Sequence, residues 1–321
     1  EIIGRTDLLK QVSRGTSNLD DLDLSPLLVQ ADPGKYKRYC AENLINQVPS
    51  TLDEKIYSDI KNYFNKKNKI EKNYKIQNIH RAVGTRLSHY IYKTISKNKI
   101  ENDFITINLS GSAGQSLGAF GIKGLKLNVI GDANDYVGKG LSGATITIKP
   151  PAESKLDTQI NTIIGNTVLY GATSGKLFAS GQSGERFAVR NSGADAVVEG
   201  CDSNGCEYMT GGCVVILGKI GDNFAAGMTG GMAFVYDPNR EITNYINSES
   251  VIWATPETNY WKKYLKSLIE EHFAETQSKI AEKVLLNFNN EIKNFVQVCP
   301  KEMLDKLSNP FTLKIKKLKA V

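Results

Sequence analysis

One glycine-rich string has the spacing of a dinucleotide-binding loop. Gly138, Gly140 and Gly143 match the pattern G-x-G-x-x-G. Such a loop binds a pyrophosphate when it follows a strand, opens a helix and is followed by an acidic residue about 20 positions later. Here a strand-like run and two prolines follow, and Ile163 and Ile164 stand where the acid should be. The string therefore predicts turns between strands and not a nucleotide site.

Three cysteines lie close enough together to suggest a metal centre. Cys201, Cys206 and Cys213 form C-x4-C-x6-C, which matches neither the common iron–sulfur spacings nor paired C-x-x-C zinc arms. The chain has five cysteines in 321 residues. This odd, low count argues against a secreted disulfide scaffold and favours a reducing compartment. We expect buried or turn-located thiols here.

Charged residues crowd one further segment, namely Glu185, Arg186, Arg190, Asp195 and Glu199. Paired carboxylates can perform acid–base chemistry, and two guanidinium groups can bind an anion. Like positions of stacked repeats lie above one another, so ion-pair ladders or a domain interface are the simpler interpretation.

The remaining candidates are scattered. His80, His89 and His272 are isolated in the sequence, and no serine or cysteine is placed by its neighbours for nucleophilic catalysis. Asn108 begins a glycosylation sequon, but nothing indicates secretion. We therefore predict no catalytic, no cofactor-binding and no metal-binding residue in this chain.

The elements that hold these residues are organised by glycine. Of 28 glycines, 24 lie between Gly111 and Gly231, about threefold more densely than the usual ~7%. Pairs of a small residue and glycine recur, and their second glycines are Gly124, Gly143, Gly175, Gly193, Gly212 and Gly231. The intervals are 19, 32, 18, 19 and 19 residues. An insertion of about 13 residues, from Lys149 to Asn161, accounts for the long one.

A short apolar strand pattern follows each glycine pair, as in residues 125–129 and 214–217. Two or three such strands and their turns would fill about 19 residues, and stacked repeats would share one core. The pattern predicts a mainly β fold: a single-stranded right-handed parallel β-helix with a mixed N-terminal lead-in and an α-helical C-terminal cap. The expected domains are residues 1–100, 101–250 and 251–321.

Helices are expected on both sides of the repeats. Thr51 and Glu54 form a capping box, and the apolar positions of the helix after it are Ile56, Ile60, Tyr63 and Phe64. A second helix is expected near Val83, Leu87, Tyr90 and Ile91, and a turn at Asp32-Pro33-Gly34. Two more should follow residue 258, one with Tyr260, Trp261, Tyr264, Leu265, Leu268 and Ile269. The other would be capped by Thr276 and carry Ile280, Val284, Leu285 and Phe288.

Composition excludes several classes of protein. The net charge is +6, carried by lysines among asparagine and isoleucine, which predicts a solvated face and not the interleaved arginine and aromatic residues of a nucleic-acid site. No apolar run is long enough to span a membrane. The chain begins with Glu1 and shows no leader, so we expect a piece of a longer or processed protein in the cytoplasm or a plastid.

Several glycine-rich segments strongly resemble the glycine-repeat (GXGXG) domain of the glutamate synthase family. They are residues 111–120, 131–143, 164–175, 184–193, 206–212 and 223–231, in the family's order. Residues 3–9 and 22–28 resemble the stretch that leaves the flavin-binding domain of that family, and residues 269–300 its C-terminal helices. Two departures are Ala144, where a glycine is common, and Asn204, where a histidine is frequent; we interpret Asn204 as a corner residue.

The resemblance implies what lies outside this chain. The complete enzyme would have an amidotransferase domain, a central domain, a synthase domain with FMN and an iron–sulfur cluster, and this region. It would use glutamine, 2-oxoglutarate and a reductant to make glutamate. This region would bind no cofactor and would hold the amidotransferase and FMN domains of the same chain in place, with an electron-donating small subunit as a further partner. Asp132, Asn134, Asp135 and Tyr136 could contact the synthase domain.

Two alternatives stay open. The chain could be a free-standing β-helix subunit or binding module of a redox complex. It could also be a β-helix enzyme acting on carbohydrate, which would need an exposed groove of acidic and aromatic residues. The electron donor (NADPH, NADH or ferredoxin) and the oligomeric state do not follow from this sequence.

Overall fold

The structure is a computed structural model that describes residues 49–64, 69–94 and 101–312, with the single positions 12, 15, 34 and 35. The chain divides into two compact units, Glu1–Pro49 and Ser50–Val321, and the architecture below is that of the second. Of the predicted turn at residues 32–34, only Gly34 is described, and it lies in a turn.

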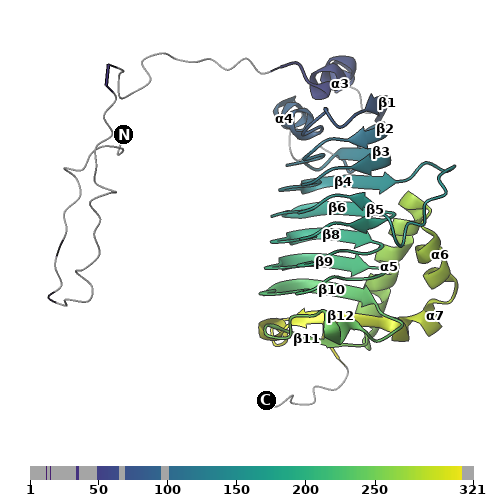
Figure 1. Cartoon of the computed structure of the whole chain (residues 1–321). Coiled ribbons are helices and arrows are strands. Elements are labelled where there is room, and N and C mark those ends of the chain that lie inside the picture. The colour runs from purple at the N-terminus through teal and green to yellow at the C-terminus, as the bar shows by residue number, and fades with distance from the viewer. Residues whose placement is uncertain are drawn as a thin grey trace. The chain divides into compact units, whose positions relative to one another are not determined.

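A 12-stranded sheet dominates the second unit (Figure 1). Its strands follow the order β1-β2-β3-β4-β6-β8-β9-β10-β12-β11, and β5 joins β3 to β7. The strands are β1 Ile70–Ile76, β2 Ile105–Ala113, β3 Leu125–Ala133, β4 Ser142–Lys149, β5 Thr162–Ile164, β6 Ser174–Ala179, β7 Gln182–Ser183, β8 Ser192–Val198, β9 Thr210–Ile216, β10 Gly230–Tyr236, β11 Val251–Ala254 and β12 Phe295–Pro300. All pairs are parallel except β10–β12 and β11–β12.

Helices flank the sheet. The α-helices are α3 Leu52–Ile60, α4 Thr85–Thr94, α5 Asn259–Thr276, α6 Lys279–Leu286 and α7 Phe288–Glu291, and the 3-10 turns are η2 Lys61–Tyr63, η4 Ile242–Asn244, η5 Ile292–Asn294 and η6 Lys301–Met303. Within the described ranges, no helix combines the length and the apolar character that crossing a membrane requires.

The predicted fold class is wrong. The fold is mixed α/β, with one mostly parallel sheet and several helices, and is not a single-stranded right-handed parallel β-helix. Each repeat adds one long strand to this sheet, where we expected two or three strands per repeat, because most of the remaining residues form turns. The C-terminal helices do not cap an end of the stack either. They pack on a face of the sheet, and β12 and β11 continue the sheet beyond β10.

The period predicted from glycine spacing is visible in the strand register. Leu177 pairs with Ala196, which lies 19 residues later, and Val214 pairs with Ala233 at the same interval. Between β4 and β6 the partners Ile146 and Leu177 are further apart, because residues 150–161 form a loop there. The periodicity and the insertion are therefore confirmed, although the fold inferred from them is not.

The turns between strands share an unusual backbone pattern. In six consecutive turns the first, third and fifth residues have positive φ, near +60°, and we call these turns the turn edge: residues 116–120, 136–140, 167–171, 186–190, 204–208 and 223–227. In one of them Arg186 N–H donates to Ser203 O (2.9 Å), Ala188 N–H to Val168 O (2.8 Å) and Arg190 N–H to Glu207 O (3.0 Å). Successive left-handed residues thus bond to the repeats on both sides.

The two faces of the sheet explain two kinds of strand sequence. In β3 only the inner face is buried, and the strand alternates apolar and polar residues. In β9 the last four residues are all buried, because α5 and α6 cover the outer face there. A continuous apolar run such as residues 214–217 is typical of a strand covered on both faces.

Helix α5 lies along the outer face of the sheet and crosses several strands (Figure 1). Glu275, in its last turn, pairs with Lys126 of β3 (Nζ–Oε1 2.6 Å), and Glu271 pairs with Lys176 of β6 (2.7 Å). At the other end Tyr264 OH donates to Asp195 of β8 (3.1 Å). Its 18 residues span about 27 Å, close to the roughly 24 Å from β3 to β10, so α5 ties six strands together.

The predicted N-terminal helices are confirmed as α3 and α4, which lie at the β1 end of the stack (Figure 1). In the capping box of α3, Thr51 N–H donates to Glu54 Oε2 (3.3 Å). Asp53, which we did not single out, is buried and accepts from Gly84 N–H (2.8 Å) and Leu87 N–H (3.0 Å) at the start of α4. Burial raises the pKa of Asp53, although these N–H donors act in the opposite direction.

The C-terminal helices are confirmed with one corrected cap. Thr258 precedes α5, and its hydroxyl accepts from Trp261 N–H (3.5 Å). The cap of α6 is Ser278, which accepts from Ala281 N–H (3.2 Å). Thr276 is instead the last residue of α5, and its hydroxyl donates to His272 O (2.6 Å).

Close approach of neighbouring repeats leads to a first prediction. A Cβ at Gly230 would collide with the carbonyl oxygen of Thr210, whereas a Cβ at Gly171 would meet nothing within 4 Å. Gly230→Ala should lower the free energy of unfolding by about 3 kcal/mol or more, because two backbones must separate. Gly171→Ala, the matched control, should cost only about 1 kcal/mol for its left-handed φ.

Urea denaturation of both variants measures this difference. Equal losses would show that backbone contact at the start of β10 does not limit the stacking of repeats.

Candidate functional site

The charged segment singled out from the sequence does not form one site. Arg186 and Arg190 are exposed on the turn edge, and Glu185 is exposed directly before it. The structure records no ion pair for these three side chains among the described residues. Asp195 points to the outer face of β8 and accepts from Tyr264. Glu199 is buried with no exposed surface. The predicted ion-pair ladder is therefore absent from the described residues, and Glu199 alone enters a polar cluster.

Glu199 joins four elements at the centre of that cluster. Its Oε1 accepts from Ser180 Oγ (2.8 Å), just after β6, and from Ser278 Oγ (2.6 Å), the cap of α6. His272 Nε2, from the last turns of α5, lies 3.9 Å from the same oxygen. Because a carboxylate at the start of a helix complements its dipole, Glu199 fixes α6 and the end of α5 to the sheet.

The arrangement differs from a catalytic triad. In a triad the nucleophilic hydroxyl donates to histidine, and the carboxylate orients that histidine from its other side. Here the hydroxyls of Ser180 and Ser278 both donate to the carboxylate of Glu199, and neither ring nitrogen of His272 has a hydrogen-bond partner. Since Glu199 and His272 are both fully buried, the geometry supports a structural connection.

Electrostatics of the pair follow from its burial. Burial lowers the pKa of His272 below its usual value, more than the neighbouring Glu199 raises it. Burial alone would raise the pKa of Glu199, but the surrounding donors lower it by more. The folded state therefore keeps an ionised carboxylate beside a neutral imidazole. Sequence reasoning treated His272 as isolated, because 73 positions separate it from Glu199.

The clustered cysteines are buried thiols, as predicted. Cys201 and Cys206 belong to the inner core, and Cys213 lies on the other face of the sheet. Burial raises the pKa of Cys201 to about 12 and those of Cys206 and Cys213 well above their usual values. In the ranges that the structure describes, no three His, Cys, Asp or Glu side chains are placed to hold a metal ion.

The nucleotide-like string forms turns and a strand. Gly138 and Gly140 have positive φ in the turn edge, and β4 begins at Ser142, where a nucleotide fold would begin a helix. Asn204 is a corner residue with a φ of 62°, as expected. Its side-chain oxygen accepts from Asn223 Nδ2 (2.9 Å), which links neighbouring repeats.

The remaining candidates lie apart on the surface. His80 Nδ1 accepts from Gln77 N–H (3.1 Å), and His89 is exposed on α4. Asn108 of the sequon lies inside β2, and its amide donates to Glu71 and Asn73 of β1. These contacts serve local structure.

The segment proposed from the resemblance as a domain contact spans the end of β3 and the next turn. Asp132 accepts from Ser112 Oγ (3.0 Å), Asp135 Oδ1 accepts from Asn166 N–H (2.8 Å), and Tyr136 is exposed. Asn134 is exposed beside them. Whether this segment contacts another domain stays a prediction.

One hollow combines acidic and aromatic residues, as a carbohydrate enzyme would require. It has a volume of about 210 Å³, and its lining includes Tyr236, Asp237, Glu241 and Tyr245. The carboxylate of Asp237 accepts from Glu241 N–H (2.9 Å) and Ile242 N–H (3.0 Å), so both its oxygens serve the chain turn. Glycoside hydrolysis needs two carboxylates that face the substrate, and this hollow does not offer that pair.

The buried carboxylate leads to a second prediction. Glu199→Gln should lower the free energy of unfolding by about 2–4 kcal/mol, because its amide N–H groups would replace a charged acceptor in a buried site. Glu185→Gln, an exposed change in a neighbouring repeat, should alter it by less than about 0.5 kcal/mol. Denaturant titration at neutral pH compares the two; an equal, small effect would show that Glu199 does not hold the helices.

The lowered pKa of His272 leads to a third prediction. The unfolded chain takes up a proton near pH 6.5, while the folded state resists it, so stability falls as pH drops below about 6.5, by at most about 1.4 kcal/mol per pH unit. Glu199 adds a further loss below its usual pKa of 4.5. His272→Gln should flatten the upper part of this dependence.

Denaturation midpoints measured from about pH 7.5 down to about pH 5 test whether stability falls on acidification. His89→Gln, in an exposed position, is the matched control and should follow the unchanged chain. A wild-type stability that rises on acidification would contradict the assignment.

The geometry can be compared with known proteins. A family model described as the GXGXG motif matches residues 53–301. The chain is 58% identical over 313 residues to the glutamate synthase [NADPH] large chain of Azospirillum brasilense, covering 98% of this chain and 21% of that protein. It is 43% identical to the glutamate synthase [NADH] of Schizosaccharomyces pombe, covering 94% and 14%, and 42% identical to the ferredoxin-dependent glutamate synthase 2 of Synechocystis, covering 94% and 19%.

The chain spans about a fifth or less of the length of these relatives. The matched residues include strands β1 to β12, helices α5 to α7 and the turn edge. Because the family model covers most of the chain, this protein belongs to the GXGXG-motif family, in the form that glutamate synthase large chains contain.

Proposed function

We propose that the chain is the structural C-terminal region of a glutamate synthase, which spaces and holds the amidotransferase and FMN synthase domains and has no catalytic residue of its own. The observation that carries the proposal is where the potentially reactive side chains lie. Glu199, His272 and the described cysteines are all buried in packing positions. The regular stack of strands, tied by α5, supports a role as a stiff spacer.

The proposed activity belongs to the whole enzyme. Glutamine and 2-oxoglutarate would be converted to two glutamates at the expense of a reductant, in an oxidoreductase reaction that assimilates ammonia. The relatives are named for NADPH, NADH and ferredoxin, so their names do not decide which donor this protein uses. We place the protein in the cytoplasm or a plastid, without nucleic acid or membrane as partners.

FMN and an iron–sulfur cluster are expected in the parent enzyme and outside this region. The described residues do not fit a cluster, because the thiols of Cys201, Cys206 and Cys213 are divided between two faces of the sheet and their raised pKa values disfavour the thiolate that binds iron. The nearest counterpart of a phosphate-binding loop, residues 138–143, leads into a strand.

A fourth prediction concerns catalysis. In the complete enzyme, Glu185→Gln and His89→Gln should each change kcat for glutamate formation by less than about twofold, because exposed side chains of a spacer do not touch the reacting atoms. The 321-residue chain expressed alone should purify without flavin. A loss of kcat beyond about 100-fold at unchanged stability, or stoichiometric flavin on the isolated chain, would contradict a non-catalytic role.

The alternative is a free-standing subunit or binding module of a redox complex. The reading frame upstream of Glu1 separates the two ideas. Flavin-domain sequence in the same frame supports the proposal, and a start codon close to Glu1 supports the alternative.

A further inference from the structure

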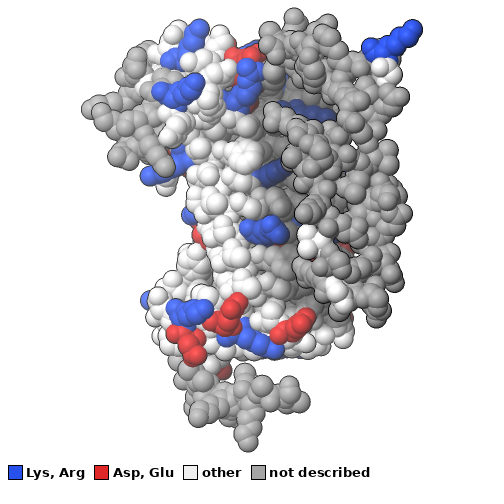
Figure 2. Space-filling view, turned by 90° about the vertical axis from the view of Figure 1, so that its left-hand side faces the viewer, with Lys and Arg blue, Asp and Glu red and all other residues white. Residues whose placement is uncertain are grey.

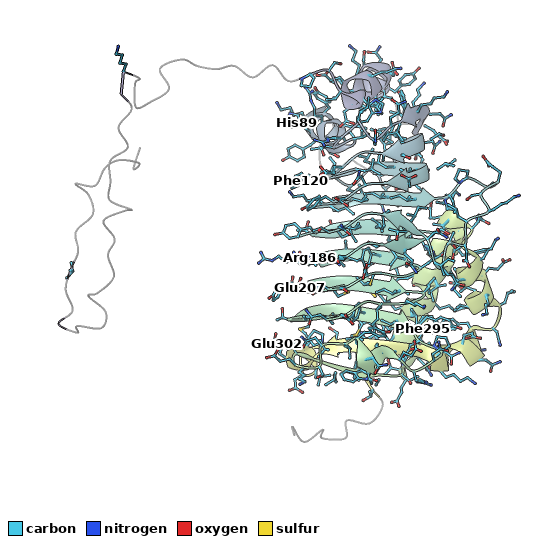
Figure 3. The ribbon with its side chains drawn as sticks, in the orientation of Figure 1. His89, Phe120, Arg186, Glu207, Phe295 and Glu302 are labelled. Atoms are coloured by element: carbon cyan, nitrogen blue, oxygen red, sulfur yellow. The ribbon has the colours of Figure 1, made fainter. Side chains whose placement is uncertain are left out.

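The turn edge is a side of the stack that the described elements leave uncovered. Helices α3 and α4 lie at one end, β12 and β11 extend the other, and α5 to α7 cover a face of the sheet (Figure 1). Figure 3 shows Phe120, Arg186 and Glu207 one above the other along the turn edge. In Figure 2, which shows this side, uncharged residues run along the middle with a few lysines and arginines among them, and acidic residues lie near the upper and lower ends.

Large side chains are displayed on this edge. Phe120 is 56% exposed and Tyr208 53% exposed, and Tyr136 is exposed between them in the series of turns. Phe120 and Tyr208 occupy the same position of turns four repeats apart, which is about 19 Å along the stack. Arg186 and Arg190 are exposed in the turn between them. The edge is thus a strip that combines aromatic rings and guanidinium groups with two carboxylates, those of Glu207 in the fifth turn and of exposed Glu185 directly before the fourth.

These residues are held in a conformation that favours glycine. Phe120, Tyr136, Arg190 and Tyr208 have φ between 52° and 61°, a conformation that disfavours residues other than glycine because Cβ lies too close to the following carbonyl oxygen. Turns of the same series use Gly140, Gly171 and Gly227 at the fifth position, so the turn does not require a side chain there. Strained, exposed aromatic residues at positions where glycine would suffice point to a binding role.

Local packing accounts for only part of each ring. A Cβ at Gly140 would lie 2.6 Å from the ring of Phe120, and one at Gly227 would lie 2.5 Å from the ring of Tyr208. The Cδ1–Cε1 side of each ring therefore lies against the glycine of the next turn. The exposed fractions given above show that much of each ring still faces solvent and forms a flat apolar surface.

The charges on the strip define the partner. Within the described ranges the structure records no ion pair to Arg186 or Arg190, although both are exposed, while Lys139 lies 5.5 Å from the centre of the Tyr136 ring. A protein surface that matches the strip would offer apolar groups to the rings and carboxylates to the guanidinium groups.

We propose that the turn edge, through Phe120, Tyr136 and Tyr208 with Arg186 and Arg190, is the docking surface for another domain of the same parent chain. This inference rests on the proposed function. About four-fifths of the relative that is 58% identical lies outside the region that this chain matches, so a large same-chain partner is the occupant that the chain length supports. The docked domain presents an apolar centre to the rings and carboxylates opposite Arg186 and Arg190.

Hydroxyl-radical labelling of the complete parent protein, followed by mass spectrometry, tests the surface. Phe120, Tyr136 and Tyr208 should be modified about tenfold more slowly than Tyr260, because a docked interface core excludes solvent. Tyr260 is 45% exposed on α5 and provides an internal reference of similar exposure. If the labelling rates of Phe120, Tyr136 and Tyr208 instead followed their exposed fractions in this structure, the inference would be overturned.

Glycine substitutions separate docking from folding. Phe120→Gly combined with Tyr208→Gly removes both rings and relieves the left-handed backbone, so the thermal midpoint should not fall for backbone reasons. Labelling of Tyr136 should then rise about tenfold, because the domain no longer covers it. Tyr260→Ala, the control, should leave Tyr136 protected. Unchanged protection of Tyr136 in the double variant would contradict the inference.

Two other outcomes distinguish a failure of the proposed function from a failure of this inference alone. An intact mass close to that of the 321 residues would refute the proposed function, and with it a partner in the same chain. Protection that disappears on dilution would show that a second copy occupies the edge, which overturns the inference but not the proposed function.

Discussion

Alternation of left-handed residues in the turn edge is the constraint on which the stack depends. A parallel strand needs partners on both edges, and the turn between strands must also satisfy its own N–H and C=O groups. In the turn of residues 186–190, positive φ at every second position directs successive N–H groups to the repeats before and after it. The turns therefore stack with the same spacing as the strands, and the core stays closed on the turn side.

This constraint also explains where the sequence was informative and where it was not. Glycine spacing predicted the period and the insertion because glycines with positive φ, such as Gly143, Gly175 and Gly212, recur near the starts of successive strands. The turn at residues 186–190 contains no glycine, although its first, third and fifth residues have positive φ. A rule that assigns positive φ to glycine cannot locate such turns. Filling each repeat of about 19 residues with two or three short strands and their turns led to the wrong fold class.

Helices and caps were more predictable because their signals are local. Thr258 lies directly before α5, and the apolar spacing after it fixes the buried face. The position of α5 was not predictable in this way. One signal was nevertheless present: residues 214–217 are continuously apolar, whereas residues 125–129 alternate. Strands that are apolar on both faces require a second layer, so the sequence held evidence that an apolar helix face packs on β9, whereas α5 meets β3 through the Glu275–Lys126 ion pair.

The buried polar cluster shows how residue types alone can mislead about the chemistry of this chain. Glu199 and His272 are far apart in the sequence and meet only because α5 returns across the sheet. A carboxylate that accepts from two serines, with a histidine 3.9 Å away, looks like catalytic machinery when only residue types are considered. The direction of the hydrogen bonds decides against it, because both hydroxyls donate to Glu199 and no solvent reaches it. What Glu199 holds is the junction of α5 and α6, and α5 in turn ties β3 through β10 together. A stack whose repeats are bonded in both directions and tied along its length resists bending, which is the mechanical property that a spacer between two catalytic domains requires.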